Sequence, residues 1–177
     1  MRTGISFLLS LFACFTVFNL QAEEAPKKFN IGIGTYAMTI AYTDSFFIDD
    51  DFIGSSFNAS YAISNNIAIR GNLYSMTHDD FSSLDVDGVD IAMLFGSGLE
   101  NLGFKAYLGG GIFNEDWKAL GATESFSGLQ LNGGIGYNWD AVSLDFMLGI
   151  RETSDYEDFL GADAASVSSS LSLSLRF

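Results

Sequence analysis

Charged residues and proline are scarce in this sequence. Charged side chains make up 17% of the 177 residues, against about 25% in an average soluble domain, and there is one proline. Glycine and aromatic residues are abundant instead, with 19 Gly, 17 Phe and 7 Tyr. A chain of this length is expected to form one domain, and its composition indicates that something other than water covers much of the surface.

Basic residues and cysteine are also few. Without Arg2 the chain carries 7 basic and 22 acidic residues, a net charge of 7 − 22 = −15, which argues against nucleic-acid phosphates as a partner. The single cysteine, Cys14, lies in a segment that we expect to be removed. The remaining chain then has neither disulfides nor thiol chemistry.

Residues 1–22 are typical of an export signal. Arg2 precedes an apolar core, and small residues suited to cleavage follow it. We expect a signal peptide that is cleaved near Ala22 and leaves 23–177 as the folded domain. An uncleaved membrane anchor and, through Cys14, a lipoprotein signal stay open as alternatives.

Long hydrophobic runs are missing from 23–177. No stretch there supplies the roughly 20 consecutive apolar residues of a membrane-spanning helix. Any passage through a membrane must therefore use β-strands, which have to close into a barrel. The segment divides into stretches of about ten residues, the strand length of a small barrel. We expect eight strands, at 29–42, 52–63, 67–77, 88–99, 104–114, 126–138, 142–152 and 166–177.

Alternation of apolar with small or polar residues is clearest at the C-terminal end. From Val167 to Phe177 the two kinds of residue alternate, and only Ser169 breaks the pattern. The segment 142–152 alternates in the same way except at Met147. A period of two is typical of strands with one apolar face.

The connections between the expected strands alternate in length. Short turns are expected at 64–66, 100–103 and 140–141, and long loops at 43–51, 78–87, 115–125 and 153–165. Short turns at one end and long loops at the other are typical of outer-membrane barrels. We also expect a bulge in the first strand, at Gly32 or Gly34.

The polar face of the strands separates a membrane barrel from a soluble sandwich or lipocalin-like barrel. On a soluble surface roughly a quarter to a third of the residues are charged, whereas here Ser, Asn, Gly, Ala and Gln predominate. We interpret the isolated charges as an ion-pair network inside a narrow lumen that side chains fill. The alternative is a set of charges on a water-exposed sheet. These charged residues are Arg70, Asp90, Lys105, Asp145, Arg151 and Arg176.

Aromatic residues lie near the expected strand ends, where their rings would sit at the level of lipid headgroups. One girdle is expected beside the short turns, at Phe29, Tyr61, Phe104, Tyr137, Trp139 and Phe177. A second is expected beside the long loops, at Tyr42, Phe52, Tyr74 and Phe126. The alternative is that these are core aromatics of a soluble protein.

With these features, the segment after residue 22 resembles the small eight-stranded outer-membrane β-barrels of the OmpA-type and opacity-type group. The terminal SVSSSLSLSLRF and the stretch YAISNNIAIRGNLY are the most specific pieces of the match. The resemblance implies an all-β fold, an eight-stranded antiparallel up-and-down transmembrane β-barrel in a bacterial outer membrane. It also implies insertion by the outer-membrane assembly machinery through the strand that ends in Phe177.

His78 is the residue that keeps an enzymatic alternative open. It is followed by Asp79, Asp80, Ser82 and Ser83, and a histidine base could activate a hydroxyl for acyl transfer on lipid A. The His-x-Ser arrangement of lipid A deacylases is absent, because Asp80 stands in the place of that serine. We therefore expect a solvated loop histidine, no catalytic residue and no cofactor.

Acidic residues concentrate in the expected long loops, where Lys118 is the only lysine or arginine. Carboxylate clusters suit Ca²⁺ or Mg²⁺, which could bridge the loops to lipopolysaccharide phosphates. None of the runs has the spacing of a defined calcium loop, and a solvated acidic face is the alternative. The candidate ligands are Asp49, Asp50, Asp51, Asp79, Asp80, Asp155, Glu157 and Asp158.

The sequence thus favours a monomeric barrel with a structural or surface-interaction role, in contact with outer-membrane lipid and lipopolysaccharide. Side chains fill a lumen of eight strands, so no open pore is expected. A lipid A-modifying barrel enzyme and a soluble periplasmic β-barrel or sandwich are the alternatives.

Overall fold

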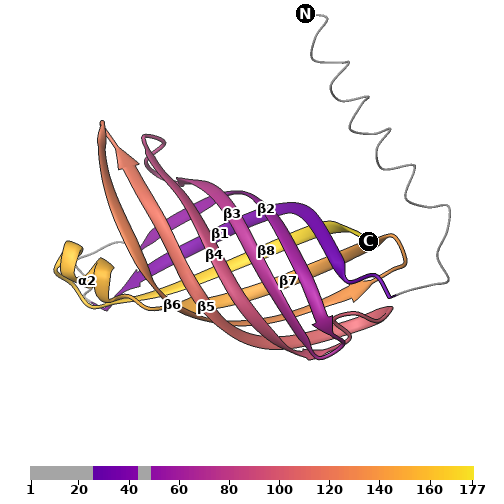
Figure 1. The fold of residues 1–177 in the computed structure, drawn as a ribbon. Coiled ribbons are helices and arrows are strands. Elements are labelled where there is room, and N and C mark those ends of the chain that lie inside the picture. The colour runs from indigo at the N-terminus through magenta and orange to yellow at the C-terminus, as the bar shows by residue number, and fades with distance from the viewer. Residues whose placement is uncertain (1–25, 44–48) are drawn as a thin grey trace, which may run out of the picture.

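Eight antiparallel strands pair in chain order and close into a barrel, because the last strand pairs with the first (Figure 1). The structure is a computed structural model that describes residues 26–43 and 49–177. The expected signal segment 1–22 lies outside the described residues. The strands are β1 Phe29–Tyr42, β2 Asp50–Ser64, β3 Ile67–His78, β4 Leu84–Ser97, β5 Gly103–Ala119, β6 Ala122–Asn138, β7 Val142–Arg151 and β8 Ala164–Arg176.

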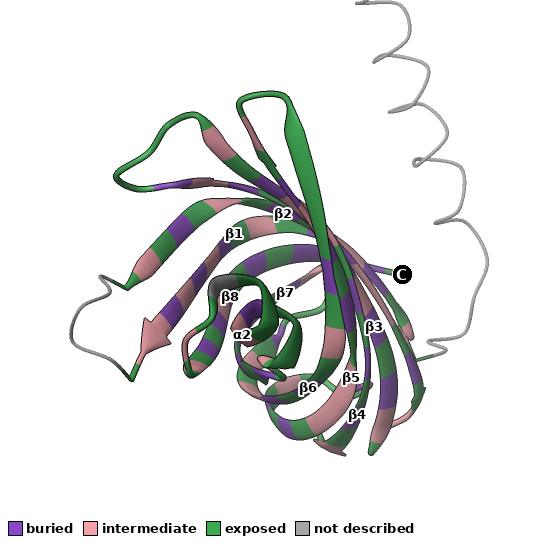
Figure 2. Ribbon diagram, turned by 90° about the vertical axis from the view of Figure 1, so that its left-hand side faces the viewer, coloured by how far each residue is buried: buried purple, intermediate pink, exposed green. Residues whose placement is uncertain are grey.

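A short helix, α2, lies between β7 and β8 at one end of the barrel. It spans Ser154–Leu160 and ends at Gly161, whose φ of 72° is left-handed. Figure 2 shows α2 lying over the mouth of the barrel. We call this end, where β1–β2, β3–β4, β5–β6 and β7–β8 are joined, the loop end, and the opposite end the short-turn end. Within the described ranges, no helix has the length and hydrophobicity needed to cross a membrane.

The pairing of β8 with β1 confirms the expected closure. It runs without a register shift from Asn30, opposite Arg176, to Tyr42, opposite Ala164. The prediction of a bulge at a first-strand glycine is therefore wrong, and the register shift lies in β2 instead, between Ala62 and Ser64. The glycine is needed for close approach, since a Cβ on Gly34 would lie 2.3 Å from the carbonyl oxygen of Leu171.

Side chains alternate between lumen and exterior along most of each strand, as the banding in Figure 2 shows, although the first four residues of β6 are all exposed. In β8 the serines other than Ser169 point inward and are buried, as is Arg176, whereas Val167, Leu171 and Leu173 are exposed. Ser169 takes an outward position. Met147 faces inward and packs in a small apolar cluster that includes Tyr107.

An apolar belt covers the outside of the barrel near the short-turn end. A soluble monomer rarely exposes a contiguous apolar patch of more than a few hundred Å². All six aromatic residues of the expected short-turn girdle are exposed at the edge of the belt, on the outside of the barrel as expected, and their place at the headgroup level stays a prediction. Exposed members of the belt include Ile33, Ile53, Phe57, Leu73, Val89, Ile91, Met93, Leu108, Ile112, Leu129, Leu131, Ile135, Leu144, Phe146, Leu148, Ile150, Val167, Leu171 and Leu173.

The prediction of an aromatic girdle at the loop end is wrong. Phe52, Tyr74 and Phe126 point into the lumen and are at most 4% exposed, and Tyr42 packs against the same interior cluster. Outward positions at this level carry polar side chains such as Thr39. At this level the outward side chains are polar, as on a surface in water. The apolar side chains therefore point inward and fill the lumen.

The predicted long loop at 115–125 is instead a β-hairpin. Strands β5 and β6 stay paired up to Ala119 and Ala122, and only Leu120 and Gly121 form the turn. Figure 1 shows this orange hairpin rising beyond the rest of the barrel wall. β6 pairs with β7 only from Gln130 onward. The part of β6 that precedes Gln130, next to the turn, therefore extends beyond the end of β7.

Candidate functional site

A fully buried ion pair lies inside the loop-end half of the lumen. Arg151 Nη1 donates to Glu115 Oε2 at 2.7 Å, and both side chains are 0% exposed. Tyr74 donates to the same Oε2, while Trp117 and Tyr156 donate to Oε1, all at 2.7 to 2.8 Å. Every contact that a buried carboxylate needs is thus present.

Aromatic rings surround this ion pair and fill the lumen. The guanidinium of Arg151 lies 4.6 Å from the ring centroid of Phe113 and 5.2 Å from that of Tyr74, within cation–π range. Tyr156 belongs to α2 and packs against Phe126 with ring centroids 4.9 Å apart. The helix is therefore fastened into the mouth by a buried ring and by a hydrogen bond to the ion pair.

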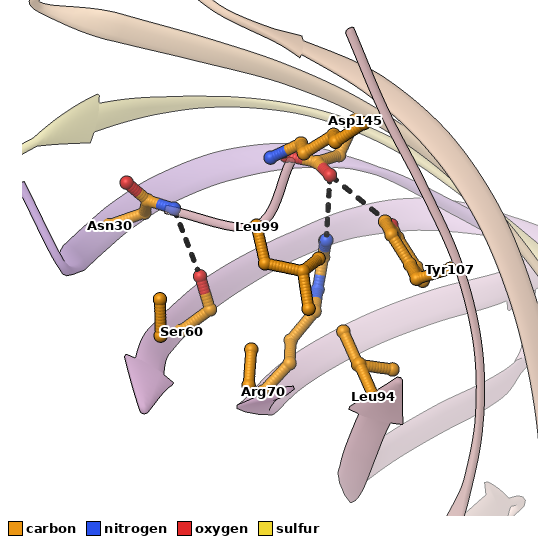
Figure 3. Close-up of a pocket in the computed structure, with 10 residues that line it drawn as sticks. Asn30, Ser60, Arg70, Leu94, Leu99, Tyr107 and Asp145 are labelled. Atoms are coloured by element: carbon orange, nitrogen blue, oxygen red, sulfur yellow. Dashed lines mark hydrogen bonds and ion pairs between the residues drawn. The ribbon is translucent and has the colours of Figure 1, made fainter. Parts of the chain in front are cut away.

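A second charged cluster lies toward the short-turn end (Figure 3). Lys105 donates to Asp145 at 2.8 Å and to Ser143 at 2.7 Å. Tyr107 donates to the other oxygen of Asp145 at 3.2 Å, and Arg70 Nη1 lies 3.8 Å from it. Leu99, in the β4–β5 turn, is buried against this cluster, so the lumen is filled at this end as well.

One hydrogen-bonded chain connects the two clusters along the lumen. Arg151 donates to Tyr36, which donates to Asp90, each at 2.9 Å. Asn72 donates to Asp90 at 2.6 Å and accepts from Arg70 Nε at 3.3 Å. All six charged residues of the predicted interior network are buried. Five of them belong to these two clusters and the chain between them, whereas Arg176 donates to backbone carbonyl oxygens.

Sequence reasoning missed Glu115, the partner of Arg151. It falls at the first position of the expected long loop 115–125, which the structure shows to be part of β5. The signal that could have found it is Phe113-Asn114-Glu115-Asp116-Trp117, in which Phe113 and Trp117 share its inward face.

The prediction that His78 is a solvated loop residue is wrong. Its side chain is 2% exposed at the end of β3 and packs edge-on against Phe52. Nδ1 accepts hydrogen bonds from the N–H groups of Asp80 and Phe81, so Nε2 carries the proton and donates to Asp50 at 3.0 Å. Asp50 also accepts from Tyr42. With both ring nitrogens hydrogen-bonded, His78 braces the loop end.

The candidate metal ligands lie at the loop end but do not form a metal site. In residues 26–43 and 49–177, no three His, Cys, Asp or Glu side chains are arranged to hold a metal ion. Several of the carboxylates cap neighbouring groups instead. Asp51 accepts from Thr39 at 2.6 Å and Asp155 from the N–H of Ser127 at 3.1 Å.

Glu157 fastens α2 to the start of β8. Its carboxylate accepts from the N–H of Ala164 at 3.0 Å and from Thr153 at 2.9 Å. The bond from the Ala164 N–H and then that from Thr153 hold the pKa of this carboxyl below its usual value.

The tip of the β5–β6 hairpin carries an unusual leucine. Leu120 is 96% exposed, and its φ of 51° is left-handed. A two-residue turn with positive φ at both positions favours Asn, Asp or Gly, and Gly121 supplies only the second. The first is occupied by a branched apolar residue that is strained and faces water.

Comparisons with known proteins find likeness in structure alone. No protein-family model matches the chain, and no curated protein matches it either. The crystal structure of Neisserial surface protein A (NspA) is similar, with a TM-score of 0.61 and 14% identity, over 87% of this chain and all of that one.

The crystal structure of Ail, the attachment invasion locus protein of Yersinia pestis, gives a TM-score of 0.57 at 16% identity, over 86% of this chain and all of that one. The crystal structure of Ail in complex with the heparin analogue sucrose octasulfate gives a TM-score of 0.53 at 19% identity, with the same coverage. These structures and the closed barrel agree with the resemblance seen in the sequence. The chain has the fold of the small eight-stranded outer-membrane β-barrels.

Proposed function

We propose that this protein is an integral outer-membrane barrel with a closed lumen, whose role is to hold the β5–β6 hairpin above the membrane as a contact surface. The observation that carries the surface role is Leu120 at the hairpin tip, where the chain accepts both backbone strain and exposure of an apolar side chain. Strain of this kind is retained where it serves a function.

The apolar belt supports the membrane location. In a periplasmic protein the side chains of this belt would face water instead of lipid. That exposure would cost about 25 cal/mol for each Å² of apolar surface. The aromatic residues beside the short turns fit the headgroup level on the periplasmic side. The strand that ends in Phe177, itself paired with Phe29, is the segment we assign to recognition by the assembly machinery, and the protein acts as a monomer.

The filled lumen supports a role other than transport. Glu115 and Arg151 sit among aromatic rings at one end, and Lys105, Asp145 and Leu99 occupy the other. In planar bilayers we expect no stable pores of porin size. Such pores would contradict the closed-lumen assignment.

The hairpin is built as a stiff support for its tip. Trp117 and Phe126 anchor its base from the inner face, with ring centroids 5.1 Å apart. On its outer face Lys118 pairs with Asp87 at 2.7 Å and Asp116 accepts from Ser125 at 2.6 Å. A rigid element loses little conformational entropy when it binds.

The charge around the tip indicates the kind of partner. Ail has been crystallised with a heparin analogue, but the loop end of this chain is rich in carboxylates, among them Asp85, Asp87 and Glu124, with Lys118 as its exposed cation. Polyanions would be repelled. A protein surface with an apolar pocket and a basic rim fits both Leu120 and these carboxylates.

The membrane part of the proposal is tested by fractionation. We expect the protein in the outer-membrane fraction, with heat-modifiable migration on a detergent gel. Recovery as a soluble periplasmic protein would overturn it.

The surface part is tested with cells that display the protein. Attachment to a panel of protein-coated surfaces should rise on expression and fall for Leu120→Asn, which removes the apolar tip and relaxes the turn. Leu102→Asn is the matched control, because Leu102 is an equally apolar, exposed residue in a turn at the opposite end. If Leu120→Asn cells attach as strongly as wild type, the hairpin is not the contact surface.

We also propose that the protein has no lipid-modifying activity, because the hydrogen bonds of His78 occupy both ring nitrogens. His78→Ala should leave the mass spectrum of lipid A unchanged relative to cells with the wild-type protein. A change in acylation would contradict this. Bridging of loop carboxylates such as Asp79 and Asp158 to lipopolysaccharide by Ca²⁺ or Mg²⁺ stays a prediction, which fails if these ions leave the melting temperature unchanged.

A further inference from the structure

The buried charges of the lumen do not balance. Four cations and three carboxylates are buried among the described residues, an excess of 4 − 3 = +1. His78 does not add to the count, because its hydrogen bonds fix the neutral form. An uncompensated charge inside a protein is costly. The seven groups are Arg70, Lys105, Arg151, Arg176, Asp90, Glu115 and Asp145.

Hydrogen bonds locate this excess near the short-turn end. Arg151 is neutralised by Glu115 at 2.7 Å. Arg176 donates to three backbone carbonyl oxygens, including that of Glu100 at 2.6 Å. Asp90 accepts hydrogen bonds from Tyr36 and Asn72. Lys105 and Arg70 remain, and the carboxylate that both approach is that of Asp145.

A small cavity lies beside these two cations (Figure 3). Its volume is about 20 Å³, and its lining includes Asn30, Arg70, Lys105, Tyr107 and Asp145, all at least nine-tenths buried. A single water needs about 10 to 15 Å³ measured in this way. The space therefore admits a particle of about the size of one water.

The donors around the cavity exceed the acceptors. Arg70 uses Nε for Asn72 and Nη2 for Ser172 and also interacts with the Tyr107 hydroxyl, while its Nη1 is 3.8 Å from Asp145, beyond hydrogen-bond distance. The ammonium of Lys105 has three N–H donors, and Asp145 and Ser143 take two of them. Both cations thus keep donor capacity for a further acceptor.

The side-chain amide of Asn30 can also offer an N–H donor to an acceptor in the cavity. Its Nδ2 donates to Ser60 at 3.2 Å, and its Oδ1 has no hydrogen-bond partner although the residue is 7% exposed. Turning the amide by 180° lets Oδ1 accept from the Ser60 hydroxyl and gives Nδ2 to the cavity, because a hydroxyl can donate as well as accept.

We propose that this cavity binds one monatomic anion, chloride, between Arg70 Nη1 and Lys105 Nζ. The charged residues that line the cavity are two cations, Arg70 and Lys105, and one carboxylate, Asp145, so one negative charge balances them and accepts the remaining N–H donors. A water would satisfy the donors but leave the positive charge uncompensated in a site of low dielectric constant. The inference is independent of the surface role proposed above.

The direct test uses bromide as the anion. The full folded chain is crystallised from detergent with bromide, and anomalous difference density is measured at the bromine edge. We expect one peak in the cavity lined by Arg70 and Lys105. Its absence from the cavity overturns the proposal, because a water-filled cavity gives no such peak.

A solution test uses melting in detergent with chloride exchanged for gluconate at constant ionic strength. We expect a saturable rise of the melting temperature with chloride. Lys105→Met should weaken the apparent affinity about tenfold to a hundredfold, the equivalent of one charge-assisted hydrogen bond. Lys118→Gln removes an exposed cation outside the lumen and should leave the affinity unchanged. Equal loss in both variants would assign the effect to surface charge and contradict the site.

Discussion

In the short-turn half of the barrel the outward side chains are apolar and the inward ones polar, whereas in the loop-end half the arrangement is reversed. Along β5, Lys105 faces the lumen and Leu108 the exterior, but farther along the same strand Trp117 faces the lumen and Asp116 the exterior. The strand continues without interruption while its surroundings change from lipid to water.

The difference shows that one barrel contains two kinds of core. In the short-turn half, polar groups must satisfy one another inside, because the exterior accepts only apolar side chains. In the loop-end half the exterior meets water, so Phe52, Met76 and Phe126 can form a hydrophobic core like that of a soluble β-protein. The pair of Glu115 and Arg151 lies inside this second core.

The largest expected effect comes from breaking that pair. Glu115→Gln leaves the charge of Arg151 buried among aromatic rings, and we expect it to lower the free energy of unfolding by about 3 to 5 kcal/mol. The measurement is urea unfolding from lipid vesicles. Asp116→Asn, its outward neighbour on β5, should change stability by less than about 0.5 kcal/mol. Equal effects at both positions would show that Glu115 is not inside a dry core.

The corresponding change in the short-turn half, where the lumen is polar, should lower the free energy of unfolding by less. Lys105→Met removes the bonds to Asp145 and Ser143, but Arg70 and Tyr107 still face the carboxylate. We expect a loss of about 2 kcal/mol, since hydrogen bonds to charged groups contribute about 1.5 to 3 kcal/mol each. A loss larger than that of Glu115→Gln in the same vesicles would reverse the comparison between the two halves.

Tyr156→Phe isolates the bond that fastens α2 to the loop-end core. The ring stays packed on Phe126, while the bond to Glu115 at 2.7 Å is lost. We expect a loss of about 1.5 kcal/mol, with faster hydrogen exchange in α2 than in the β-strands. Unchanged exchange in α2 would mean that the apolar contacts alone hold the helix.

Strand number, closure and most of the interior charges could be predicted, because alternation with a period of two persists wherever one face is apolar. The hairpin of β5 and β6 and the inward rings of Phe52, Tyr74 and Phe126 could not. Beyond the belt both Asp116 and Glu115 are acidic, although one faces water and the other the lumen. The reversal of polarity thus hides the inside–outside pattern just where the barrel leaves the lipid.

Leu120→Asn is expected to act in the opposite direction from the changes in the lumen. Asparagine adopts left-handed φ more readily than leucine, so the variant should be more stable by about 0.5 to 1 kcal/mol. A destabilised variant would show that the leucine side chain contributes to the fold and would weaken its assignment as a contact residue.

The smallest effect concerns acid pH. Because folding lowers the pKa of Glu157, its carboxylate stabilises the α2 segment above the usual carboxyl pKa of 4.5, and this contribution is lost as the pH falls below that value through the lowered pKa. Amide NMR shifts of α2 should report the loss, and Glu157→Gln should abolish that pH dependence. An identical acid titration in the variant would assign the change to another group.

The reversal of polarity along β5 is tested most directly by spin labels on single cysteines, which is practicable because Cys14 is the sole native cysteine. Labels at Leu108 and Ile112 should collide with oxygen dissolved in lipid, a label at Asp116 with a water-soluble nickel complex, and a label at Trp117 with neither. A label at Asp116 that reports lipid, or one at Leu108 that reports water, would contradict the account.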